Sequence, residues 1–190
     1  MQLAEISAPG AAIGVVAGVA VGAMSLFAGF PVGWAIVGTL TLGAPLALFG
    51  AGYAVLVALG RFKVGVFAPA AVYWMVGFPV SRLVHETMTP AVLGGSPTPP
   101  DDVLAFLAFQ ALVSLGFAIG FIWLFERVAP AWLVTIKGRN PAAEQLYSHY
   151  AHHAAAMWEA RERRRARRSD RLGDRSTADA VAQGRSRRSA

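Results

Sequence analysis

Long stretches without a formal charge occupy the first two thirds of the chain. Residues 6–60 contain no Asp, Glu, Lys or Arg, and neither do residues 64–81 or 103–125. A helix needs about 20 residues to cross a hydrocarbon core of about 30 Å. The pattern therefore predicts four transmembrane helices, at about residues 11–28, 34–59, 64–83 and 103–125.

A short break divides the longest of these stretches. The segment Gly29-Phe30-Pro31-Val32-Gly33 combines two glycines with a proline, a composition that favours a turn over a continuous helix. We therefore expect an all-α membrane protein with a four-helix bundle over residues 1–136. Pro45 lies midway along the second span, where it can kink the helix. Residues 1–10 lack Lys and Arg, so we expect the first span to be retained rather than cleaved as a signal peptide.

Polar sequence replaces the apolar spans towards the C-terminus. Asn140, Pro141 and Glu144 form a helix-start pattern of N-cap, first-turn proline and first-turn acid. We expect a basic amphipathic helix within residues 137–172, followed by a disordered tail over residues 173–190, which are small and polar. An apolar stripe at helical spacing would rest on the membrane, the bundle or a partner helix: Leu146, Tyr150, His153 and Met157.

The basic residues are distributed asymmetrically between the two sides of such a bundle. Of 17 Lys and Arg residues, only Arg82 falls on the side that carries the loop after the third span. Because Lys and Arg concentrate in cytoplasmic loops, we expect the chain to span the cytoplasmic membrane with both termini in the cytoplasm. The strong bias of basic residues towards Arg hints at a bacterial source.

The composition and the motifs exclude several function classes. The chain has no cysteine, so thiol catalysis, disulfides and Cys-ligated metals are ruled out. The sequence contains no phosphate-binding P-loop, no HExxH motif and no nucleophile elbow. His149, His152 and His153 could form a metal pair, but no third ligand lies nearby apart from Glu144. We therefore assign no catalytic, cofactor-binding or metal-binding residue.

Glycines recur every four residues along the first span and once in the fourth. Small residues at this spacing let a second helix backbone approach closely, which drives helix association in lipid. The glycines pack helices inside the bundle in one interpretation and form a homo-oligomeric or partner seam in the other. They are Gly10, Gly14, Gly18, Gly22, Gly116 and Gly120.

Polar side chains gather at the outer side of the bundle. Arg82, His85 and Glu86 share one helical face if the third helix continues that far, and Asp101 and Asp102 precede the fourth span. This group is interfacial anchoring in one interpretation, and a cation site or acid–base site in the other. We expect an extended Gly- and Pro-rich loop from about residue 85 to residue 102.

The membrane interior itself is almost free of charge. Gln110 and Ser114 are one turn apart in the fourth span, and we expect them to form interhelical hydrogen bonds. Ionisable residues within spans usually mark transport or proton pathways, and none lies deep in a predicted span. The pattern therefore argues against an ion-coupled transporter.

A dense basic run follows the predicted amphipathic stripe. Beside a membrane, each Lys or Arg near an anionic surface contributes about 1 kcal/mol of attraction. We expect this run to bind anionic lipid on the cytoplasmic face, with an acidic protein partner or nucleic acid as lesser alternatives. It comprises Arg161, Arg163, Arg164, Arg165, Arg167, Arg168 and Arg171.

Three functions fit these features. The first is a non-enzymatic accessory, scaffold or assembly subunit of a larger membrane complex, with a membrane-protein partner or a second copy of the chain. A small transporter or channel around the glycine faces and Pro45 is the second. The third is a membrane-surface enzyme that uses His85, Glu86 and the outer aspartates.

Overall fold

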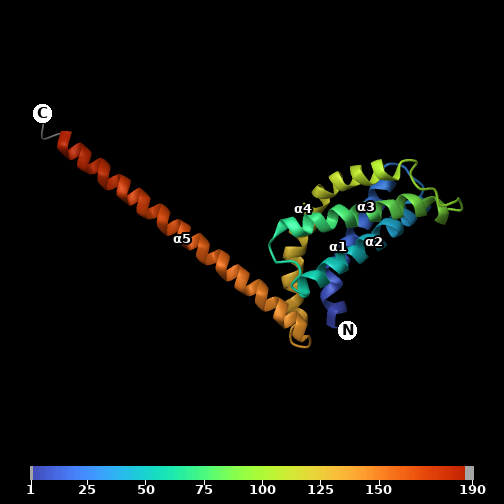
Figure 1. Cartoon of the computed structure of the whole chain (residues 1–190), viewed down its shortest axis with the longest axis horizontal. Helices are drawn as coiled ribbons and strands as arrows, with labels where there is room; N and C mark the ends of the chain where they lie inside the picture. The colour runs from blue at the N-terminus through green and yellow to red at the C-terminus, as the bar shows by residue number, and fades with distance from the viewer. Residues whose placement is uncertain (1, 187–190) are drawn as a thin grey trace. The chain divides into compact units, whose positions relative to one another are not determined.

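A computed structural model describes the backbone of residues 2–186 and the side chains of residues 2–165. All secondary-structure elements of the described chain are helices (Figure 1). Four of the helices are long and apolar enough to cross a membrane, so the predicted four-helix membrane-type bundle is confirmed. The chain divides into two units, residues 1–148 and 149–190, and each is described by itself. The helices are α1 (Gln2–Phe27), α2 (Val32–Ala58), α3 (Phe67–Val92), α4 (Val103–Ile136) and α5 (Pro141–Ser186).

The first four helices form a ring in which each helix has two neighbours. α2 packs against α1 and α3, and α4 packs against α3 and α1. Consecutive helices run antiparallel, since short connections join α1 to α2, α2 to α3 and α3 to α4 (Figure 1). The bundle therefore has two ends, one with the connection between α2 and α3 and the other with the two remaining connections.

Glycines in the left-handed region end the first three helices. Gly29, Gly60 and Gly94 have φ angles of 84°, 69° and 94°. After α3, the Gly95 N–H donates to the carbonyl of Pro90 at 3.0 Å, and the Gly94 N–H donates to that of Ala91 at 3.3 Å. This is the Schellman pattern, in which two otherwise unpaired carbonyls of the last turn are satisfied. Glycine is favoured at these positions because it adopts positive φ without a steric penalty.

The third helix is longer than expected. We predicted a span at 64–83 and a loop from residue 85, whereas α3 runs to Val92 and the loop covers residues 93–102. Pro90 cannot donate a backbone hydrogen bond and its ring crowds the carbonyl four residues back, but it lies inside α3 and does not end the helix. The helix continues until Gly94 supplies a left-handed cap. Consequently Arg82, His85 and Glu86 all lie on one continuous helix.

The first and fourth helices also extend beyond their predicted bounds. α1 begins at Gln2 rather than near Ala11 and contains Pro9. Pro9 cannot donate to the carbonyl of Glu5 four residues earlier, and the indole N–H of Trp132 donates to this carbonyl instead, at 2.7 Å. α4 passes through Pro130 to Ile136, although we expected its span to end near Phe125.

Asn140 joins three parts of the chain at this end of the bundle. Its carbonyl oxygen accepts the backbone N–H of Ala143 at 3.2 Å, as predicted for the N-cap of α5. Its amide nitrogen donates to the backbone carbonyl of Gln2 at 2.9 Å and to the Glu5 carboxylate at 3.1 Å. Arg139 adds an ion pair to Glu5 at 3.3 Å. The start of α1 is therefore tied to the junction of α4 and α5.

The last helix continues beyond its expected end at about Leu172. α5 runs to Ser186, so residues 173–186, which we expected to be disordered, are helical. The segment contains no proline that would stop the helix, although Gly173 and Gly184 have low helix propensity. Residues 187–190 of the expected tail lie outside the described residues.

An aromatic cluster fills the bundle between α2, α3 and α4. Tyr53 packs edge-on against Phe121 and Phe125, with ring centroids 5.3 and 5.1 Å away. Trp74 is fully buried and lies 4.7 Å from Phe117. Aromatic pairs at such distances contribute about 0.5–1.5 kcal/mol each beyond the area they bury. These rings occupy the centre of the bundle near the end that carries the connection between α2 and α3.

Candidate functional site

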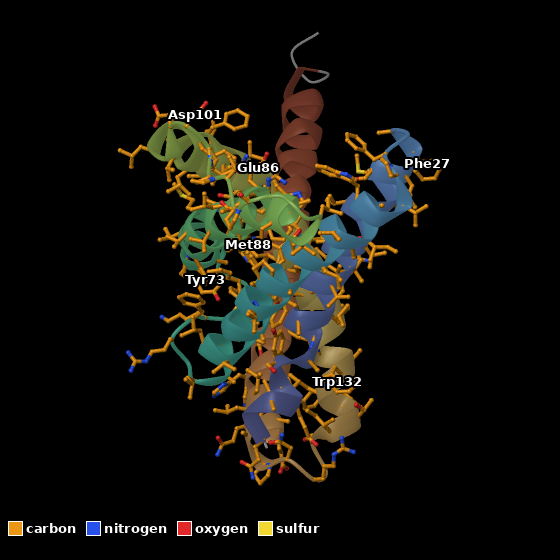
Figure 2. All side chains as sticks on the ribbon, turned by 90° about the vertical axis from the view of Figure 1, so that its right-hand side faces the viewer. Phe27, Tyr73, Glu86, Met88, Asp101 and Trp132 are labelled. Carbon is orange, nitrogen blue, oxygen red and sulfur yellow. The ribbon has the colours of Figure 1, made fainter. Side chains whose placement is uncertain are left out.

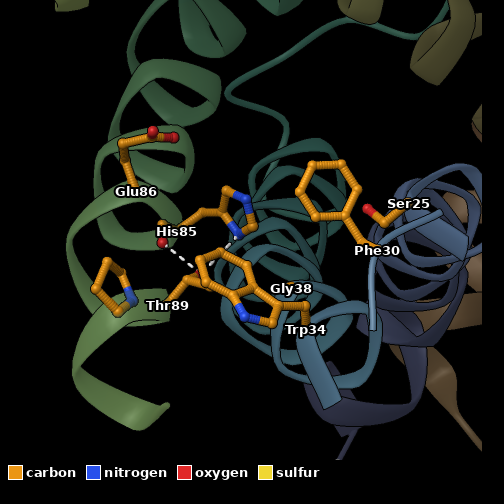
Figure 3. A pocket seen from close by; sticks show the side chains of 8 residues that line it. Ser25, Phe30, Trp34, Gly38, His85, Glu86 and Thr89 are labelled. Atoms are coloured by element: carbon orange, nitrogen blue, oxygen red, sulfur yellow. Dashed lines mark hydrogen bonds between the residues drawn. The ribbon is translucent and has the colours of Figure 1, made fainter. Parts of the chain in front are cut away.

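A cavity of about 260 Å³ lies at the bundle end that carries the connection after α1 and the loop after α3 (Figure 3). Figure 2 shows Phe27, Glu86 and Asp101 towards this end, and Trp132 towards the other. The wall is formed by the end of α1, the start of α2 and the second half of α3. Its lining residues are Ser25, Phe30, Trp34, Gly38, His85, Glu86, Thr89 and Pro90.

His85 is the ring that divides this cavity from the interior of the bundle. Its Nδ1 lies 2.9 Å from the hydroxyl of Thr41 on α2 and 3.3 Å from the hydroxyl of Thr89 on its own helix. The two hydroxyls lie 2.9 Å from each other. The ring packs against Gly38, where a Cβ would lie in van der Waals contact with Cε1 of His85 at 3.4 Å. The imidazole is therefore held against α2 by a compact polar group.

The hydroxyl partners favour one tautomer of the His85 ring. Thr41 reaches the carbonyl of Val37 at 2.9 Å, and Thr89 reaches that of His85 at 2.7 Å, each four residues back in its helix. When both hydroxyl protons are used in this way, Nδ1 of His85 is the donor to Thr41. Nε2 then carries the lone pair, and no described residue hydrogen-bonds to it. Figure 3 shows the ring in the cavity wall.

The other members of the predicted polar cluster have different partners. Arg82 and Glu86 form an ion pair of 3.4 Å one turn apart on α3. Asp102 is the N-cap of α4, where its carboxylate accepts the N–H of Ala105 at 2.9 Å. No hydrogen bond among the described residues joins His85 to Asp101 or Asp102. The five residues therefore share one end of the bundle without forming one site.

The cavity combines hydrogen-bond acceptors with aromatic walls. Nε2 of His85 and the carboxylate of Glu86 can each accept a hydrogen bond, and Phe30 and Trp34 lie beside them with ring centroids 6.3 Å apart. An arrangement of this kind suits a small donor or cationic group. Among the described residues, no three His, Asp or Glu side chains are placed to hold a metal ion together.

The four glycines of α1 all face α2. A Cβ on Gly18 would lie 2.5 Å from the Cα of Gly43 and 2.8 Å from the carbonyl oxygen of Thr39. Gly10, Gly14 and Gly22 are equally close to α2, opposite Gly50, Leu46 and Thr39. Backbone therefore packs on backbone along the whole length of the pair, as the intramolecular interpretation requires.

Gly116 and Gly120 do not share this role. Both are exposed, and a Cβ on either would meet no described atom within 4 Å. They lie on the outer side of α4, away from α1 and α3. At these two positions, the described residues therefore do not show packing inside the bundle.

The described part of the arginine run is exposed. The side chains of residues 161–165 are all accessible, and Arg163 forms an exposed pair with Glu159 at 3.2 Å. Such a pair on a helix surface contributes at most a few tenths of a kcal/mol. The side chains of Arg167, Arg168 and Arg171 lie outside the described residues.

Several residues of the cavity could not be identified from the sequence. Thr41 and Thr89 carry no motif, and only the register between α2 and α3 brings them to His85. Trp34 begins the second predicted span, and the structure shows that it lines the cavity. Comparison with known proteins finds no family model, no curated protein and no solved structure that matches the chain.

Proposed function

We propose that this chain is a non-enzymatic subunit of a larger complex in the bacterial cytoplasmic membrane, with both termini in the cytoplasm. In this role the bundle anchors the chain and α5 binds a second membrane protein. The observation that carries the proposal is the exposure of large apolar side chains on α5: Met157 is 48% exposed and Trp158 is 62% exposed. Exposed aromatics of this kind are typical anchors of protein interfaces.

The surroundings of these two residues support docking. From Ala151 to Arg165 every side chain is exposed except the half-buried Ala160. In proteins, most of the stability of a helix comes from tertiary packing. A helix with this much exposed surface therefore gains stability from a partner. The arginine run begins directly after Trp158 and adds attraction to anionic lipid at the cytoplasmic face.

The bundle gives less support to transport or to catalysis. Every fully buried polar side chain described in the structure is uncharged: Ser81, Thr89, Gln110, Ser114 and Asn140. Pathways for ions and protons are usually lined by ionisable groups. His85, the candidate base of an enzyme, is hydrogen-bonded to threonine hydroxyls and not to a carboxylate.

Photocrosslinking in native membranes tests this proposal. A photoreactive amino acid replaces Trp158 in the full chain, and a matched control replaces the exposed His152 on the same helix. We expect one reproducible protein adduct from position 158 that is weak or missing from position 152. Adducts with lipid alone at position 158, or recovery of the chain without a stoichiometric partner in mild detergent, contradict the proposal.

A further inference from the structure

A second cavity is formed by the bundle alone and is independent of α5. Its volume is about 470 Å³, and α1, α2, α3 and α4 all contribute to its wall. Most of that wall is apolar, with Phe78, Phe109, Val113 and Phe117 among the lining residues. Two polar side chains, Arg82 and Gln110, are the exceptions. Ligand cavities generally combine an apolar lining with a few placed polar groups, in a volume of about 300–1,000 Å³.

Gln110 is the unexpected member of this wall. The residue is only 7% exposed, yet its side-chain amide makes no hydrogen bond with any described residue. Its predicted neighbour in a polar pair, Ser114, donates instead to the carbonyl of Ala111 at 2.6 Å. Because Gln110 lines the cavity, a ligand there can hydrogen-bond to its amide.

Arg82 supplies the charge that selects the ligand. Its guanidinium has five N–H donors, and among described residues it forms one hydrogen bond, to Glu86 at 3.4 Å. The side chain is 25% exposed, so most of it is shielded by the bundle. Guanidinium groups bind phosphate and carboxylate through two parallel hydrogen bonds. The remaining donors of Arg82 suit an anionic oxygen group.

We propose that this cavity binds an amphiphile with an anionic head, whose phosphate or carboxylate is held by Arg82 and Gln110 and whose acyl chain lies along Phe78, Phe109 and Phe117. The glutamine amide donates to the same anionic group as the guanidinium. Phe109 is 62% exposed and lies at the rim of the cavity. A chain can therefore enter sideways from the bilayer rather than from water.

Lipid retention by the purified full-length protein tests the proposal. The probes are dioleoyl phosphatidic acid, oleate and the uncharged dioleoylglycerol, each titrated into the detergent-solubilised protein and measured by native mass spectrometry. We expect the two anionic probes to bind at least about tenfold more tightly than dioleoylglycerol, since a charge-assisted hydrogen bond is roughly twice as strong as a neutral one. Tight binding by one of the two anions alone identifies its head group as the ligand.

Three variants distinguish lipid binding in this cavity from unspecific lipid binding. Arg82→Gln and Gln110→Glu are expected to weaken anion binding by about tenfold or more, because the first removes the cation and the second places a carboxylate beside it. Arg61→Gln, in the exposed connection between α2 and α3, is the matched control and retains wild-type binding. Equal losses in all three variants, equal affinities of the three probes, or unchanged affinity in Gln110→Glu at wild-type thermal stability each overturn the proposal.

Discussion

The hydroxyl of Thr41 on α2 and Nδ1 of His85 on α3 lie 2.9 Å apart, although 44 positions separate the two residues in the chain. Thr89 lies within hydrogen-bonding distance of both. Three polar side chains therefore help to fix the register between α2 and α3, together with the Tyr73 hydroxyl, which donates to the carbonyl of Phe49 at 2.7 Å. This contact also forms the inner wall of the cavity beside Trp34.

Replacement of Thr41 by valine should destabilise the bundle. The substitution keeps the shape of the side chain but leaves Nδ1 of His85 with Thr89 as its remaining partner, which costs about 0.5–1.5 kcal/mol, the net contribution of a typical hydrogen bond. Thermal unfolding in detergent measures the loss. Thr135→Val is the control, because Thr135 is exposed and bonds only to the carbonyl of Trp132. Equal unfolding temperatures for the two variants contradict the assigned role of Thr41.

A single methyl group on Gly18 should be more harmful than the same group on Gly116. A Cβ on Gly18 would lie 2.5 Å from the Cα of Gly43, so Gly18→Ala forces α1 away from α2 at a cost of about 1–3 kcal/mol. Gly116→Ala places its methyl in open space. Unfolding of both variants in the same detergent gives the comparison. A loss of stability in Gly116→Ala instead would point to an interface between copies of the chain.

The two functions of Asn140 can be separated by two substitutions. Asn140→Ala removes both the cap of α5 and the bonds to Gln2 and Glu5, and a lost N-cap costs about 0.5–2 kcal/mol. Asn140→Asp keeps the acceptor for Ala143 but places a second carboxylate beside Glu5. Hydrogen exchange should therefore increase at the start of α1 in both variants, and at the start of α5 only in Asn140→Ala. Faster exchange at α5 in both variants would show that the cap of α5 depends on the contacts that Asn140 makes with α1.

The arginine run should draw α5 onto anionic membranes. A cysteine at Ala156, in a chain that has no other cysteine, carries a polarity-sensitive dye in proteoliposomes. Its emission should shift to the blue in phosphatidylglycerol vesicles but not in phosphatidylcholine vesicles. Replacement of Arg161, Arg163, Arg164 and Arg165 by Gln removes about 4 kcal/mol of attraction at about 1 kcal/mol each, and 1 M salt should have a similar effect through screening. A shift that survives both treatments excludes an electrostatic cause.

The orientation of the chain in the membrane can be tested with single cysteines introduced into the same cysteine-free chain. A membrane-impermeant maleimide should label Ser96→Cys, in the loop after α3, when added to intact cells. Ser148→Cys, which is exposed on α5, should react only after the membrane is opened. This follows from the concentration of 16 of the 17 basic residues on one side of the spans. The reverse labelling pattern would place both termini outside.

The spans could be predicted because charge-free length alone identifies them. Their ends were harder to predict, because α1, α3 and α4 extend past the expected bounds and contain Pro9, Pro90 and Pro130. In the first case the carbonyl left free by the proline is satisfied by Trp132, a residue far away in sequence. Local sequence signals do not contain this information.

The candidate site was predictable only in part. The four-residue spacing identified the glycine face of α1, but the partner helix and the outward position of Gly116 depend on how the helices are arranged. Similarly, Arg82, His85 and Glu86 were recognised by their chemistry, whereas Thr41 became visible only through the register between α2 and α3. Gln110 was expected to bond between helices and instead lines a cavity.

The glycine-lined contact has a consequence for motion within the bundle. Because backbone packs closely on backbone where Gly14 and Gly18 meet α2, we expect α1 and α2 to move as one unit. Across the ring, α3 and α4 meet through side chains such as Trp74 and Phe117, whose ring centroids lie 4.7 Å apart and which can adopt other rotamers. Residues of α3 line both cavities, His85 in the first and Arg82 in the second. A displacement of α3 therefore changes the volumes of both cavities together.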